Sequence, residues 1–292
     1  MPFFMMNPEQ RPCFSSEKQP RLLYVSLWTF ANHEKPRTMH RHNDICEVLL
    51  TVEGHGVHTI DGETCHTSRG DLLVYNAGVV HEDDSPVGGM ERIYCCGVGG
   101  LHLPGLPENC LLPRGASARL RTGARFGDFE ALYRLIYEQA TDPRRHSDEI
   151  AARLLPVLLL MVTQLGWEEG DPDRPESAQA NQMRGYIDTH YNEELTLEKI
   201  SDQAGISPYY ASHLFKEYCG FSPMQYVMRR RIGEAQSLLL SSEENIAEIA
   251  QKTGFESPNH FSTMFNKHTG YAPTAYRKVF RTLRTENEKR NI

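Results

Sequence analysis

The sequence predicts a two-domain α+β protein, with a small N-terminal β-barrel flanked by helices and an all-helical C-terminal domain. β-Forming residues and glycines dominate up to residue 98, helical periodicity begins at residue 128, and only short helices follow residue 182. The 292 residues suffice for two ordinary domains. A composition of 39% hydrophobic and 24% charged residues is typical of soluble globular proteins.

The N-terminal segment reads as short strands separated by turns. Strands are predicted at 22–30, 47–52, 57–60, 71–75 and 92–98. The sequence Glu-Gly-His-Gly at 53–56 and the pair Asp61-Gly62 are predicted to form hairpin turns between them. Short strands at regular spacing favour a sandwich or a small barrel.

The next segment, 128–167, is predicted to be helical. Phe129, Leu132, Leu135 and Ile136 follow the spacing of one helix face, and a second apolar stretch spans 150–165. We expect these helices to form a dimerisation segment; the alternative is that they only pack against the barrel. The polar residues 168–182, with two prolines, predict a linker.

The charge distribution separates the two halves. The net charge is −7, yet residues from Ala180 onward hold 14 Lys and Arg against 13 Asp and Glu, so the acidity belongs to the N-terminal part. Basic residues gather locally at 229–231 and after 276, and phosphate contact requires only a local positive face.

Seven cysteines without a C-x-x-C pair argue against a disulfide framework, and no signal peptide or long apolar run is present. We therefore expect a cytoplasmic protein.

The C-terminal segment contains an internal repeat. Nine identities recur in constant order at an offset of 49 residues and, after one inserted residue, at an offset of 50. The pairs are Ile200/Ile249, Gly205/Gly254, Ser207/Ser257, Pro208/Pro258, Ser212/Ser262, Phe215/Phe265, Gly220/Gly270, Pro223/Pro273 and Tyr226/Tyr276.

Each copy has the pattern of a helix-turn-helix. Gly205 and Gly254 end the first helices, because glycine adopts the left-handed C-terminal conformation without penalty. The Ser-Pro pairs at 207–208 and 257–258 supply the N-cap and first residue of the second helices. The alternative for one copy alone is a plain helical hairpin, but matching caps in both favour the helix-turn-helix. A continuous helix over 226–240 is predicted to join the copies. The outward positions that can reach base edges are Tyr209, Tyr210, Ser212, His213, Lys216, Asn259, His260, Ser262, Thr263 and Lys267.

Residues 183–281 resemble the DNA-binding domain of AraC/XylS-family regulators, most specifically in the second copy, GFESPNHFSTMFNKHTGYAPTAYRK. The resemblance implies that both recognition helices enter successive major-groove segments. Eight of the ten outward positions, all except the two lysines, fall where family members touch DNA. None is an arginine, so bidentate reading of guanine is not available from them. We expect readout through Asn259, the histidines and apolar contacts to thymine methyl groups.

Two further patterns resemble the cupin motifs, which implies a double-stranded β-barrel. They are His40-x-His42-x4-Glu47-x6-Gly54 and Gly70-x5-Asn76-x-Gly78-x2-His81. Three positions depart from the motifs: Glu34 replaces the leading glycine, Asn76 the usual proline and Ser85 the closing asparagine. Alternation along a strand places His40 and His42 on one face, where Glu47 and His81 can join them.

This set of three histidines and one carboxylate has two interpretations. Imidazole and carboxylate ligands suit a divalent Zn, Ni, Mn or Fe ion. The same residues can instead line an effector pocket without metal, as in the sensory barrels of AraC-like regulators. The other histidines of the barrel segment, His33, His55, His58, His66 and His102, are expected at turns or on the surface, and the pair Cys95-Cys96 in a buried strand.

Together these patterns predict a regulator that is not an enzyme. Its expected parts are an effector-sensing barrel at 1–127, a dimerisation segment at 128–167, a linker at 168–182 and a double helix-turn-helix domain at 183–292. Operator DNA, a small-molecule effector (by resemblance a sugar or related metabolite), RNA polymerase and a second copy of the chain are the implied partners, with no membrane. The alternatives are a metal-dependent cupin enzyme or metal sensor with an accessory DNA-binding domain, and a constitutive DNA-binding or architectural protein.

Overall fold

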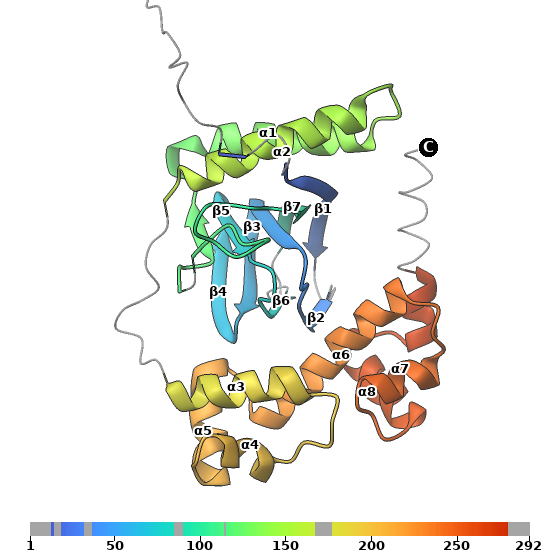
Figure 1. The fold of residues 1–292 in the computed structure, drawn as a ribbon. Coiled ribbons are helices and arrows are strands. Elements are labelled where there is room, and N and C mark those ends of the chain that lie inside the picture. The colour runs from blue at the N-terminus through green and yellow to red at the C-terminus, as the bar shows by residue number, and fades with distance from the viewer. Residues whose placement is uncertain are drawn as a thin grey trace, which may run out of the picture.

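A computed structural model describes residues 13–14, 19–31, 37–84, 90–113, 115–166 and 177–279. It confirms the two-domain α+β fold: a β-sheet domain with two helices, then a helical domain. The two sheets lie between the helix pair α1–α2 on one side and the helices α3–α8 on the other (Figure 1). Within the described residues, no helix is both long and apolar enough to cross a membrane.

The sheet domain is built around one long strand. The strands are β1 (Arg21–Ala31), β2 (Arg37–His40), β3 (Cys46–Ile60), β4 (Glu63–Ser68), β5 (Asp71–Tyr75), β6 (His81–Asp84), β7 (Met90–Gly99) and β8 (Arg119–Arg121). The first part of β3 pairs with β5 and β7, in a sheet of order β1-β7-β3-β5-β8. Its second part pairs with β4 and β6, and β6 also pairs with β2. All pairings are antiparallel, so β3 belongs to both sheets.

The turn expected at residues 53–56 is wrong, because β3 runs through it. The register with β7 shifts between Thr51 and Glu53, and Gly54 has a φ of +76°. A Cβ atom at Gly54 would lie 1.7 Å from the carbonyl oxygen of Met90, so only glycine fits. The glycines therefore mark a bulge that bends the strand from one sheet into the other. The second expected turn, Asp61-Gly62, does join β3 to β4, with positive φ at both residues.

Helices α1 (Phe126–Thr141) and α2 (Ser147–Thr163) form the expected helical pair, preceded by the short 3-10 helix η1 (Gly123–Arg125). Their buried side chains, including Phe129, Tyr133 and Leu158, share a hydrophobic core with the sheet residues Val48 and Cys96. Both Cys95 and Cys96 are buried in β7, as expected.

The helical domain contains two similar units joined by one long helix. Its helices include α3 (Ala178–His190), α4 (Leu197–Gln203), α5 (Pro208–Cys219), α6 (Pro223–Ser241), α7 (Ile246–Lys252) and α8 (Pro258–Thr269). Ser207 and Ser257 cap α5 and α8, and glycines with positive φ follow both helices, as predicted. Helix α6 spans the predicted 226–240 and contributes side chains to the cores of both units. Residues 168–176 of the predicted linker 168–182, together with Trp167 and the segment 280–292, lie outside the described residues.

Candidate functional site

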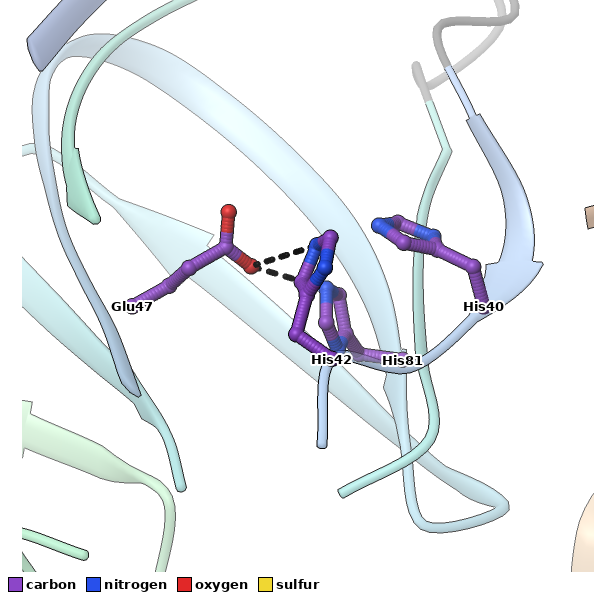
Figure 2. Close-up of side chains that lie close together, drawn as sticks. All are labelled: His40, His42, Glu47 and His81. Atoms are coloured by element: carbon purple, nitrogen blue, oxygen red, sulfur yellow. Dashed lines mark ion pairs between the residues drawn. The ribbon is translucent and has the colours of Figure 1, made fainter. Parts of the chain in front are cut away.

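The four residues of the cupin-like patterns converge inside the sheet domain. One ligand atom from each of His40, His42, Glu47 and His81 lies within 4.8 Å of the others. The side chains point toward one another from three directions (Figure 2). His40, Glu47 and His81 are buried, and His42 is partly exposed. We call these four residues the histidine cluster.

Three strands and one loop position the cluster. His40 ends β2 and lies directly opposite His81 of β6, while Glu47 lies near the start of β3. The expectation that His40 and His42 share a strand face is wrong, because β2 stops at His40. His42 reaches the cluster from the following loop, with its ring centroid 5.1 Å from that of His40.

Two backbone carbonyls fix the orientation of the buried histidines. His40 Nδ1 lies 3.0 Å from the Thr38 carbonyl oxygen, and His81 Nδ1 lies 3.1 Å from that of Val79. A carbonyl oxygen only accepts hydrogen bonds, so each Nδ1 carries a proton. A neutral ring then presents the Nε2 lone pair to the cluster, the orientation that metal-binding histidines adopt.

Glu47 is the anionic centre of the cluster. Its Oε1 accepts hydrogen bonds from the Tyr24 hydroxyl and, at 3.7 Å, from the Cys95 thiol, while its Oε2 lies 3.0 Å from His81 Nε2 and 3.9 Å from His42 Nε2. Burial raises the pKa of this carboxyl, but the hydrogen bond and positive charge of His81, with His42 and Tyr24, lower the pKa by more, to well below its usual range. Glu47 is therefore ionised.

The pair of His81 and Glu47 requires a positive charge. A neutral His81 protonated on Nδ1 would oppose a lone pair to a carboxylate oxygen at 3.0 Å, which is repulsive. Either a second proton on His81 or a cation bound by both groups removes the repulsion. Around a tetrahedral ion with bonds of about 2.0–2.1 Å, ligand atoms lie about 3.4 Å apart, which the four residues can reach with small movements. The donor set therefore fits a divalent metal and equally fits the polar groups of an organic effector.

A second polar network, absent from the sequence-based expectations, lies beside the cluster. His58 was expected at a turn or on the surface, yet it is fully buried in β3 and contacts Asp83, Thr67 and Glu91. Tyr75 connects the two groups, because its hydroxyl donates to Asp83 and its ring stacks on His81 at 4.1 Å. The alternation of β3 beyond its bulge was the missed signal, since it places His58 and Ile60 on the inner face.

The predicted DNA-reading residues lie on the two recognition helices, α5 and α8. Ser212 and Ser262 are half-buried, and the other eight are exposed. His213 Nδ1 lies 2.8 Å from the Tyr209 carbonyl oxygen and so donates to it, which leaves Nε2 of a neutral ring as an outward acceptor. The hydroxyls of Ser262 and Thr263 donate to carbonyls one turn earlier in α8. Asn259 and His260 lie in the first turn of α8, where helix-turn-helix proteins contact bases.

A separate surface pocket lies between the β4–β5 turn and the start of α1. Arg69, Arg119 and Arg121 line it together with Asp71 and Phe126. Arg69 stacks on Phe126, and Arg119 donates to the carbonyl oxygen of His66, so two of the three arginines already have partners in the fold. No cluster residue reaches this pocket.

Comparison with known proteins gives matches to both domains. Residues 22–159 match the model of the AraC-like ligand-binding domain, and residues 200–279 match that of a helix-turn-helix domain. The chain is 26% identical over 280 residues to YdiP of Escherichia coli K12, named an uncharacterized HTH-type transcriptional regulator, covering 94% of this chain and 91% of the relative. It is 23% identical over 302 residues to the melibiose operon regulatory protein of Escherichia coli K12, covering 94% and 97%. The solved C-terminal domain of AraT, a response regulator from Geobacillus stearothermophilus, is 35% identical, with a TM-score of 0.35, and the match covers 36% of this chain and 87% of that one.

Proposed function

Because this chain belongs to the AraC family of DNA-binding transcription regulators, we propose that an effector held by the histidine cluster controls how its two helix-turn-helix units bind an operator. The observation that carries the proposal is the convergence of His40, His42, Glu47 and His81 inside the matched ligand-binding domain. The family consists of regulators rather than enzymes, and we therefore do not propose the alternative of a metal-dependent cupin enzyme.

The effector we propose first is a sugar or a related metabolite. Hydroxyl and carboxylate groups are what histidines and a buried carboxylate recognise, and the melibiose operon regulator among the relatives carries a sugar in its name. A screen of metabolites by melting temperature identifies the effector, since a ligand at 100 times its Kd adds about 2.7 kcal/mol to the free energy of unfolding. His42→Ala or Glu47→Ala should abolish the effector's influence on DNA binding without unfolding the helical domain.

Operator reading is proposed to depend on side chains rather than on charge alone. With duplex DNA selected in vitro by the wild-type protein, His213→Ala and Asn259→Ala should each weaken binding by about 1–3 kcal/mol, with little change on random DNA. Thr189→Ala, an exposed position on α3 outside both recognition helices, is the control and should change neither. Equal losses on selected and random DNA would show that His213 and Asn259 do not read bases.

A second candidate function is metal sensing, favoured by the Nε2 atoms of His81 and His42, which lie 3.0 Å and 3.9 Å from Glu47 Oε2. Protein purified without chelator should then contain one equivalent of a divalent metal, lost in His81→Ala and kept in the control His102→Ala. Occupancy should fall as the pH drops through the titration range of histidine, because metal-bound imidazoles must be neutral. Less than a tenth of an equivalent in the wild-type protein leaves only the organic effector.

We further propose that the chain acts in the cytoplasm as a homodimer and contacts RNA polymerase at the promoter. The dimer is proposed to form through α1 and α2, and contact with RNA polymerase follows from the family.

A further inference from the structure

The ribbon formed by β2 and β6 has two functional faces. Side chains alternate along a strand, so neighbours point to opposite sides. His40 and His81, opposite each other in the pairing, face the histidine cluster. Met39 and Val80, their neighbours, lie on the other side, within the hydrophobic core of the first helix-turn-helix unit. One short ribbon is thus a wall of the candidate site and a part of the core of the helical domain.

The ribbon docks on the middle of α6. The carbonyl oxygen of Met39 accepts a hydrogen bond from Arg230 Nη1 at 3.2 Å, and the Thr38 backbone N–H donates to Gln236 Oε1 at 2.8 Å. On β6, Glu82 forms an ion pair with Arg229. Arg230 and Gln236 are fully buried, so these contacts are closed to water. Figure 1 shows β2 beside α6 at the junction between the two helix-turn-helix units.

The docking position lies between the parts of α6 that serve each unit. Tyr226 and Val227 belong to the core of the first unit, whereas Ile232 and Leu239 belong to that of the second. Gln236 also donates to the hydroxyl of Tyr276, inside the second unit. Contacts at residues 229–236 can therefore affect how α5 and α8 are held relative to each other.

We propose that the β2–β6 ribbon transmits the state of the histidine cluster to α6, and through α6 to both recognition helices. The inference rests on the proposed function of the cluster. A ligand bound by His40 and His81 links the two strands at their paired residues, and this stabilises the face that docks on α6. Occupied protein then holds α6 more firmly than empty protein.

Gly233 offers a substitution that separates docking from ligand binding. It lies on α6 against β2, and a Cβ atom there would be 1.9 Å from the Met39 carbonyl oxygen and 2.9 Å from that of Thr38. Both obstacles are backbone atoms, so Gly233→Ala must push the ribbon away, although alanine itself favours the helix. Gly185 in α3 is the matched control, since a Cβ atom there meets nothing within 4 Å. Arg229→Gln is a second variant, which removes the ion pair with Glu82 and the stacking of the guanidinium on Phe221 but adds no atom against the ribbon.

The test is hydrogen exchange on the full chain, with peptides covering 37–41, 78–84 and 228–240, without metal and with one equivalent of Zn²⁺ as the probe. Without metal, Gly233→Ala should raise exchange at 37–41 at least tenfold, and Gly185→Ala should not. In wild-type protein Zn²⁺ should slow exchange in all three peptides. In Gly233→Ala and Arg229→Gln it should slow exchange only in 37–41 and 78–84.

The outcomes separate two claims: that the histidine cluster binds a ligand, and that the ribbon transmits this binding to α6. Equal protection of 228–240 by Zn²⁺ in wild type and in Gly233→Ala overturns the inference, as does unchanged exchange at 37–41 in metal-free Gly233→Ala. Protection of the cluster strands but not of 228–240 in wild type overturns the inference and leaves the cluster as a ligand site. If Zn²⁺ protects none of the three peptides in wild type, the cluster is not a metal site. The proposed transmission of metal binding to α6 is then wrong as well. The same Zn²⁺ should change affinity for selected DNA at least fivefold in wild type and less than twofold in Gly233→Ala.

Discussion

His58 carries a positive charge inside the sheet domain. Its Nδ1 lies 2.7 Å from Asp83 Oδ1, its Nε2 lies 3.4 Å from Glu91 Oε1, and the Tyr75 hydroxyl shares the Asp83 oxygen. Burial lowers the pKa of His58, but hydrogen bonds and charge interactions with the two carboxylates raise it by more, to about 9 from 6.5. The same contacts lower the pKa of Asp83 despite its burial. Loss of the proton from His58 would leave the carboxylates at its two ring nitrogens without the cation that lies between them.

This charge predicts a pH-dependent stability. The pKa of His58 is higher in the folded than in the unfolded chain. The contribution of His58 to the free energy of unfolding is therefore fully present below pH 6.5 and is lost as pH rises through about 9. The free energy of unfolding should fall by about 3 kcal/mol over that interval, at 1.36 kcal/mol per pKa unit. Urea unfolding of the wild-type protein and of His58→Gln from pH 6 to 9 measures it. The difference in free energy of unfolding between the two proteins should become smaller as pH rises. A constant difference would show that His58 is neutral in the fold. The comparison also removes the effect of the buried thiols, whose raised pKa values act alike in both proteins.

At the scale of elements, local signals in the sequence were sufficient for the helical domain and insufficient for the sheets. The caps and glycines of α5 and α8 lie within a few residues of the helices they delimit, so the pattern alone placed both recognition helices. The ribbon was not predicted, because β2 and β6 have four residues each and pair across 40 positions of the chain. Long-range pairing leaves no periodic pattern in so short a strand.

Two glycines show why the sequence alone does not reveal close backbone contacts within strands and helices. Gly54 was interpreted as part of a turn, and Gly233 reads only as a weak position in a helix. In the structure each is the site of a close backbone approach, to Met90 in one case and to Met39 in the other. The approaching segments lie far away in sequence, and only the assembled fold reveals them. The convergence of His40, His42, Glu47 and His81 could be predicted, because two recognisable spacings contain all four.

At the scale of the whole molecule, α1 and α2 lie on the side of the sheets opposite the helical domain (Figure 1). This arrangement leaves α5 and α8 accessible to DNA when two copies associate through α1 and α2. Leu135 of α1 and Ile150, Val157 and Leu160 of α2 are large apolar side chains that remain exposed. Ile150 and Val157 are separated by two helical turns and so lie on one face of α2. An exposed apolar stripe of this kind favours an interface.

We therefore predict that the full chain is a homodimer at micromolar concentration and that Val157→Glu makes it a monomer, because a carboxylate buried without a partner opposes association. Met90→Glu is the matched control, since Met90 of β7 has similar exposure (41% against 46% for Val157) on a different element. Sedimentation velocity measures the assembly of all three proteins.

A dimer tethers two DNA-binding domains, so Val157→Glu should also weaken binding to DNA with two sites by about 10²–10⁴-fold and leave single-site binding unchanged. A wild-type chain that sediments as a monomer would contradict the prediction. A Val157→Glu dimer would place the interface away from this face of α2.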